Sequence, residues 1–258
     1  MVGLAQLAER LVVVQEVAGS TPVAHPHGTV CAAVLQGGRT GYPVRPPSFF
    51  TVPAHFSLHE KPPKDHLKMT VLPITIWGEP VLHRRASEVE IFDDELRTLI
   101  ADMFETNDAA NGVGLAAPQV GVGKRIFVYK YANDDGAPPT GVVVNPVLTL
   151  SKISGAVPDP DEEEEGCLSF PSGQYPLKRA EWARVEGFDG FGQPVKFEAT
   201  GWFARVIQHE YDHLDGKLYV NRLMDRYKRK AMKLAKKNGW GVPGLTWMPG
   251  VDSDPFGH

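Results

Sequence analysis

The segment TGWFARVIQHEYDHLDG, residues 200–216, predicts an amphipathic helix that carries the most informative pattern of the sequence. Thr200 is a suitable N-cap residue, and Gly216 can adopt the left-handed conformation that ends many helices. Between them, apolar side chains recur at helical spacing and form one stripe. The members of this stripe are Phe203, Val206, Ile207, Tyr211 and Leu214. One side of the helix is therefore expected to face a hydrophobic core.

His209 and His213 are four residues apart in this segment, so both imidazoles lie on one face of the helix. Two histidines in this arrangement can bind one metal ion. Glu210, between them, can then act as a base on a water molecule that the metal activates. The pattern is typical of enzymes that hydrolyse amide bonds. The alternative is two ordinary histidines on an exposed helix face.

A third protein ligand distinguishes the classes of such hydrolases. The extended motif of metzincin proteases needs a third histidine at a position where this chain has Tyr219. Thermolysin-like proteases use a downstream glutamate, and no glutamate follows Glu210 in the sequence. The third ligand is therefore expected upstream. A metallopeptidase of another class, with Asp225 or an unidentified residue as its third ligand, remains the alternative.

Cys167 is the upstream candidate for this ligand. The chain has two cysteines, Cys31 and Cys167, which do not indicate a disulfide framework in 258 residues. Cys167 lies in EGCLSFP, residues 165–171, and its thiolate is a suitable ligand for a transition metal. The alternative is a small buried hydrophobic residue, which is the common state of a free cysteine.

A third segment, GVGLAAPQ at residues 112–119, is small and glycine-rich and ends in the amide of Gln119. It lacks the lysine and the serine or threonine of a phosphate-binding loop. A glycine backbone lets a substrate approach closely, and Gln119 can donate a hydrogen bond. Considered alone, the segment is equally typical of a tight turn.

Taken together, these segments resemble the three signature motifs of the peptide deformylases. The matching stretches are residues 112–119, 165–169 and 208–214, and their order and spacing also agree with that family. The resemblance extends from about Met69 to the C-terminus. The C-terminal tail is similar to the tails of actinobacterial members.

The resemblance implies metal-dependent hydrolysis of the N-formyl group from the N-terminal formylmethionine of newly synthesised proteins, with release of formate. It implies that Cys167, His209 and His213 bind one divalent metal ion. Fe2+ is the typical ion in the family, and Zn2+, Ni2+ or Co2+ can occupy the same site. Residue types alone do not choose among these ions, because thiolate and imidazole suit several of them.

The resemblance also implies roles for the residues around the metal. Glu210 is expected to act as general base, and the Gln119 side chain and the Leu168 backbone N–H are expected to stabilise the oxyanion. Gly114 and Glu165 are expected to contact the substrate or to orient the metal ligands. A catalytically inert binding protein is disfavoured, because every ligand and the base are present.

The pattern around the motifs predicts an α+β fold, with mixed or antiparallel β-sheets around a central motif-bearing helix. Asp93 can cap an amphipathic helix with apolar residues at Leu96, Leu99, Ile100, Met103 and Phe104. Strands are predicted at 126–129, 142–150, 182–185 and 195–199. Turns are predicted at 137–139 and 189–190, and a solvated loop in the first half of the acidic run 159–165.

We expect residues 69–225 to form the catalytic domain and residues 226–258 to form a basic C-terminal helix and tail. The cationic residues between 226 and 237 fit either a solvated helix or a helix that contacts ribosomal RNA near the exit of the nascent chain. The expected substrates are N-formylmethionyl nascent peptides. No segment of the sequence is apolar enough to span a membrane. The expected state is a cytoplasmic monomer, since a thiolate metal site suits a reducing compartment.

Residues 1–68 match nothing in the family and are expected to be a disordered extension or the product of a mispredicted start. They lack clean periodicity, and the apolar run 11–14 is too short for the core of a signal peptide. No acidic residue lies between Glu16 and Glu60, so an organellar transit peptide is the alternative. We favour Met69 as the first residue of the native protein.

Deletion of residues 1–68 should therefore leave the rate of formate release from a formyl-methionyl peptide unchanged. The intact mass of the protein from native cells should correspond to a chain that begins at or near Met69. A native mass that includes residues 1–68 would contradict the expected start.

Overall fold

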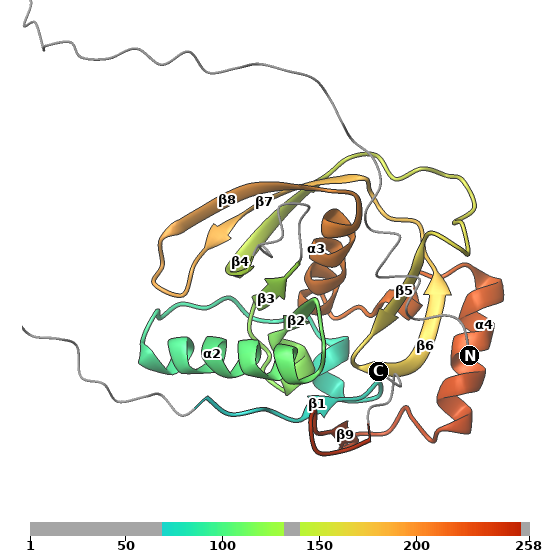
Figure 1. Cartoon of the computed structure of the whole chain (residues 1–258), viewed down its shortest axis with the longest axis horizontal. Coiled ribbons are helices and arrows are strands. Elements are labelled where there is room, and N and C mark those ends of the chain that lie inside the picture. The colour runs from blue at the N-terminus through green and yellow to red at the C-terminus, as the bar shows by residue number, and fades with distance from the viewer. Residues whose placement is uncertain (1–68, 132–139, 254–258) are drawn as a thin grey trace, which may run out of the picture. The chain divides into compact units, whose positions relative to one another are not determined.

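The computed structural model describes residues 69–131 and 140–253 (Figure 1). The expected extension 1–68 and the turn predicted at 137–139 lie outside these residues. Within the described ranges, the helices are all too short or too polar to cross a lipid bilayer.

The main sheet has five strands in the order β2-β3-β4-β7-β8, and each neighbouring pair is antiparallel. Its members are β2 (Gly114–Ala116), β3 (Ile126–Lys130), β4 (Thr140–Leu150), β7 (Trp182–Phe188) and β8 (Pro194–Thr200). The four strands predicted from their β-branched and aromatic residues fall within the last four of these, so that prediction is confirmed.

Two smaller antiparallel sheets complete the β-structure of residues 69–131 and 140–253. One is the hairpin of β5 (Glu164–Cys167) and β6 (Phe170–Pro176). The other pairs β1 (Ile74–Thr75) with β9 (Thr246–Trp247), near the two ends of the described chain. These short strands were not predicted. Strands β1 and β9 have two residues each, too few for a period-2 pattern, and β5 and β6 contain Gly, Pro and Glu, which are uncommon in strands.

The helices are α2 (Asp94–Ala109), α3 (Gly201–Leu214) and α4 (Asp225–Lys237). Short 3-10 turns occur at η1 (Pro80–His83), η2 (Ala117–Val120) and η3 (Tyr219–Asn221). The predicted cap of α2 is confirmed, because the Asp93 carboxylate accepts from the Leu96 N–H at 2.9 Å.

The ends of α3 are where they were predicted, but one cap differs. Thr200 occupies the N-cap position, yet its side chain makes no capping hydrogen bond within the described chain. Gly216, one residue beyond the C-cap, has φ +70°. A Cβ there would lie 2.7 Å from the Arg84 carbonyl carbon. Glycine therefore permits both the positive φ and the close approach of the segment that follows η1.

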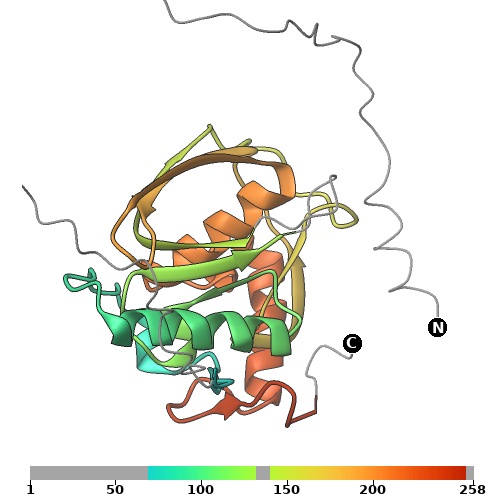
Figure 2. The same ribbon diagram turned by 60° about the vertical axis from the view of Figure 1, so that its left-hand side comes forward.

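Helix α3 is buried on nearly all sides. The main sheet curves around it in Figure 2, and apolar residues of α3 pack into a cluster with that sheet. The members from α3 are Ala204, Ile207 and Leu214, and those from the sheet include Phe127, Tyr129, Val143 and Val185. The α+β fold with a central motif-bearing helix is therefore confirmed. His209 and His213 are 8% and 0% exposed, which excludes ordinary histidines on an exposed face.

Helix α4 lies against the β5–β6 hairpin in Figure 1 and buries Ala231 and Ala235 in a second cluster with Phe170 and Leu218. The cationic residues of α4 are all exposed. The segment that follows α4 returns to the core, where Trp247 pairs with Ile74 and is 7% exposed. The tail is thus an ordered part of the fold as far as residue 253.

Candidate active site

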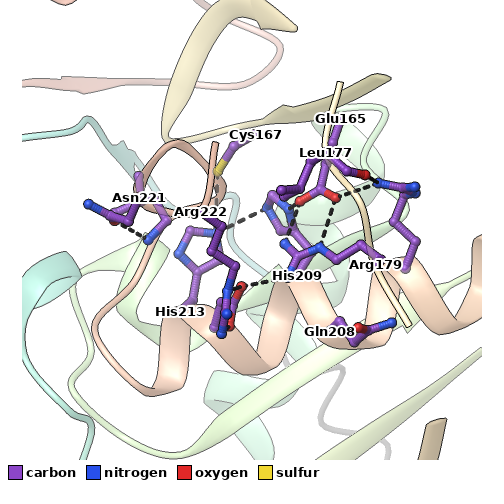
Figure 3. A network of polar contacts seen from close by, with 12 residues as sticks. Glu165, Cys167, Leu177, Arg179, Gln208, His209, His213, Asn221 and Arg222 are labelled. Carbon is purple, nitrogen blue, oxygen red and sulfur yellow. Dashed lines mark hydrogen bonds and ion pairs between the residues drawn. The ribbon is translucent and has the colours of Figure 1, made fainter. Parts of the chain in front are cut away.

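Three ligand atoms converge at one place beside α3 (Figure 3). The nitrogen and sulfur atoms of Cys167, His209 and His213 all lie within 4.8 Å of one another. The Cys167 Sγ is 3.3 Å from the His213 Nε2, which is itself 3.3 Å from the His209 Nε2. Metal–ligand bonds of about 2.1 Å to nitrogen and about 2.3 Å to sulfur at tetrahedral angles would separate these atoms by about 3.4–3.6 Å. The observed arrangement therefore fits a single metal ion.

Two elements distant in sequence supply these ligands. His209 and His213 come from successive turns of α3, and Cys167 is the last residue of β5. The Cys167 side chain is 4% exposed, so all three ligands are shielded from bulk water. The chemistry of the set, one thiolate and two imidazoles, suits a first-row transition metal.

Glu165 fixes the orientation of the His209 ring. The Glu165 Oε1 is 2.7 Å from the His209 Nδ1, which leaves the His209 Nε2 directed toward the other two ligands. This is the usual arrangement in which a carboxylate selects the tautomer of a metal-binding histidine. Burial alone would raise the pKa of Glu165, but the adjacent charge of Arg179 and the hydrogen bond with His209 hold it far below its ordinary value.

Arg179 is the centre of a buried network of charges that sequence reasoning missed. Its guanidinium donates to both oxygens of Glu165, at 2.6 and 3.0 Å, and to the Asp212 Oδ2 at 2.7 Å. Arg205 donates to the Glu165 Oε2 at 3.0 Å, and Arg222 pairs with the other side of Asp212 (Figure 3). Glu165 and Asp212 thus each have at least two cationic partners, which offset the cost of removing these carboxylates from water.

Glu210 is 3% exposed and faces the backbone of β2. A Cβ on Gly114 would lie 2.5 Å from the Glu210 Oε1, so only glycine leaves room for this carboxylate. Burial raises the pKa of Glu210 to about 7. Its Oε2 has no hydrogen-bond partner among the described residues and can therefore take up a proton.

Gln119 is held with its amide N–H directed at the ligand cluster. Its Oε1 accepts from the Ala116 N–H at 2.8 Å, and its Nε2 donates toward the Cys167 Sγ at 3.8 Å. Leu168 directly follows Cys167, and its side chain lies close to Gly112. A Cβ added to Gly112 would be 3.1 Å from the Leu168 side chain. The glycine-rich segment, the cysteine segment and α3 therefore meet at one site.

Gln208 does not face this site. Its side-chain amide bonds both the N–H and the carbonyl of Ala180, at 3.0 and 2.8 Å, and so ties α3 to the segment before β7. Asp225, the ligand of the alternative metallopeptidase, begins α4, is exposed and is not a member of the cluster.

Comparisons with known proteins identify the family. A sequence model described as "Polypeptide deformylase" matches residues 71–229. A peptide deformylase from Mycolicibacterium smegmatis is 55% identical over 197 residues, which are 74% of this chain and 100% of that relative. The chain belongs to the peptide deformylase family. This membership confirms the resemblance and makes the chain a metal-dependent hydrolase.

Solved structures of other members of the deformylase family agree with this assignment. The peptide deformylase of Legionella pneumophila has a TM-score of 0.58 and 37% identity, and the match covers 66% of this chain and 96% of that one. The peptide deformylase of Thermus thermophilus has a TM-score of 0.56 and 40% identity, over 65% and 94% of the two chains. Their shared fold is the α+β arrangement described above.

The buried network makes Arg179 a target for substitution. Arg179→Met should lower the free energy of unfolding by about 3 kcal/mol, because Glu165 and Asp212 lose their shared cation while remaining buried. It should also weaken metal binding about tenfold or more, since Glu165 would hold His209 less firmly. Chemical denaturation and metal titration measure the two effects.

Arg184→Met is the matched control for this substitution. Arg184 pairs with Glu198 at 2.9 Å on the surface, with the two side chains 41% and 53% exposed. An exposed ion pair contributes little to the free energy of unfolding, so the control should leave stability and metal binding nearly unchanged. Equal effects of the two substitutions would contradict the importance assigned to the buried network.

Proposed function

We propose that Cys167, His209 and His213 bind one divalent metal ion, and that this site hydrolyses the N-formyl group of newly synthesised proteins. The observation that carries the proposal is the convergence of one thiolate and two imidazoles within 4.8 Å in a buried site. Deformylation of N-terminal formylmethionine is the activity of the family to which the chain belongs.

The metal ion supplies Lewis-acid chemistry when bound, because it lowers the pKa of water and polarises the carbonyl oxygen of the substrate. We propose Fe2+ as the ion in the cell, with Zn2+, Ni2+ or Co2+ accepted by the same ligands. The mixed thiolate and imidazole set supports this range. Metal analysis of protein purified without oxygen tests the assignment.

Glu210 is proposed as the group that moves the proton. It takes a proton from the attacking water as the new bond forms between the water oxygen and the formyl carbon. It returns that proton to the departing nitrogen as the carbon–nitrogen bond breaks. Formate and a peptide with a free methionine amino group are the products. The burial of Glu210 between two ligands supports the role, because the carboxylate is held close to the site and away from bulk water.

The Gln119 amide and the Leu168 backbone N–H are proposed to stabilise the negative charge that develops on the formyl oxygen. Donors that are already oriented require no reorganisation during the reaction. The hydrogen bond from the Ala116 N–H to the Gln119 Oε1 supports this role, because it prevents the amide from turning its oxygen toward the charge. Gly114 and Glu165 are proposed to position Glu210 and His209, respectively.

We propose that the enzyme works as a cytoplasmic monomer and that residues 69–225 carry the chemistry. The exposed cations of α4 are proposed to contact ribosomal RNA near the exit of the nascent chain, because an exposed basic helix face suits a phosphate backbone. Cosedimentation with ribosomes at increasing salt tests this contact. Binding that is absent or insensitive to salt would contradict it.

The purified enzyme should release formate from a formyl-methionyl peptide, and a metal chelator should abolish that release because the proposed reaction requires the ion. A colorimetric formate assay measures both results, and re-addition of the metal should restore turnover. Cleavage of internal peptide bonds without formate release would instead favour the alternative metallopeptidase.

Glu210→Gln should retain the metal and lose nearly all turnover, because the amide has the shape of the carboxylate but cannot accept a proton. Cys167→Ala is the complementary variant, and it should lose or weaken metal binding. Elemental analysis and the formate assay separate the two defects. Turnover near the wild-type rate in Glu210→Gln would remove the proposed role of that residue.

A further inference from the structure

The small β1–β9 sheet contacts both segments that carry the proposed oxyanion donors. In Figures 1 and 2 the sheet lies beside α2, away from the curved main sheet. It forms when Ile74 and Thr75 of β1 pair with Trp247 and Thr246 of β9. Neither strand contributes a metal ligand or a proposed proton donor.

Trp247 anchors the Leu168 segment. The indole Nε1 of Trp247 donates to the Leu168 carbonyl at 3.0 Å, and the Trp247 side chain is buried. The next carbonyl, that of Ser169, accepts from the Trp77 backbone N–H at 2.8 Å. Two consecutive carbonyls directly after Cys167 are thus held from the side of the β1–β9 sheet.

Thr75 anchors the Gln119 segment in the same way. Its hydroxyl lies 3.0 Å from the Gln119 carbonyl and 3.3 Å from the Pro118 carbonyl, and the Thr75 side chain is buried. The hydroxyl therefore holds the main chain of η2, from which the Gln119 amide extends toward the ligand cluster.

These anchors constrain the donors for a geometric reason. Peptide units are planar, so only the φ and ψ rotations of Leu168 separate its N–H from its anchored carbonyl. At the other end, the N–H shares a peptide unit with Cys167, a proposed metal ligand. Loss of the indole hydrogen bond would free the ψ rotation and let the N–H move relative to the reacting carbon.

We propose that Trp247 and Thr75 are positioning residues for the oxyanion donors, so that the C-terminal strand β9 supports the site that residues 69–225 form. This inference rests on the proposed function, because it presupposes the donor roles of Gln119 and Leu168. Strand β9 lies beyond residue 229, where the match to the family's sequence model ends. The matched region therefore lacks one of the two anchors that hold its donors.

Trp247→Phe tests the proposal, because it keeps an aromatic ring and removes the indole N–H. We expect kcat to fall on the order of tenfold, less than the roughly 100-fold loss that follows removal of an oxyanion donor itself. KM and metal content should stay within about twofold of wild type, since the lost interaction acts on the transition state. Steady-state formate release and elemental analysis give these values.

Trp240→Phe is the matched control. The Trp240 ring packs edge-on against Phe170, 5.0 Å between centroids, so the substitution makes the same change in the same C-terminal segment without touching the Leu168 carbonyl. We expect kcat of this variant to remain within about twofold of wild type. A purely structural role of the tail would lower kcat alike in both variants, which would overturn the proposal.

Thr75→Val gives a second test that does not depend on Trp247→Phe folding correctly. It replaces the hydroxyl by a methyl group of similar size, and the same selective fall in kcat is expected. The inference would be overturned if the wild-type enzyme releases formate and kcat is unchanged in Thr75→Val. The same holds if Trp247→Phe folds and its kcat is unchanged. If wild type itself releases none, the proposed function fails instead, so the two failures are distinguishable.

Discussion

The hydrogen bond between Glu165 and His209 is the contact on which the metal site depends. A carboxylate in this position must be ionised to hold the imidazole, and Glu165, which β5 carries, is buried against α3. An isolated buried charge would be too costly, so the structure surrounds it with Arg179 and Arg205. Arg179 then requires a second carboxylate, Asp212, from the same helix as the histidines. The orientation of the His209 ring therefore depends on a layer of buried charges that consists of Glu165, Asp212 and their arginine partners.

A second constraint acts on the opposite side of the ligands. Glu210 and Gln119 must approach the same point as Cys167, which requires β2 and η2 to lie directly against α3. Gly114 allows that approach because no side chain stands between its backbone and Glu210. The site thus lies between a buried polar layer that holds His209 and the closely packed backbone of β2 and η2, against which Glu210 of α3 lies and from which Gln119 extends.

The parts of the site that were predictable are those encoded by local spacing. The two histidines, their glutamate and the helix that carries them follow from spacing and periodicity within residues 200–216. Cys167 alone was equally compatible with a buried hydrophobic residue, and only the resemblance of three motifs together indicated it as a ligand. The role of Arg179 could not be predicted, because its partners Glu165 and Asp212 lie 14 and 33 residues away in the sequence. Local sequence patterns do not indicate ion pairs between residues so far apart. Strands β1 and β9 were missed for the same reason, since two residues have no period and only their pairing defines them.

The pairing of β1 with β9 also has a consequence for biosynthesis. It joins residue 74 to residue 247, so one of the sheets beside the active site cannot form until residue 247 has been made. Contacts of such long sequence separation form late, because a large loop must close first. The enzyme therefore completes its fold only after its own C-terminal segment has left the ribosome.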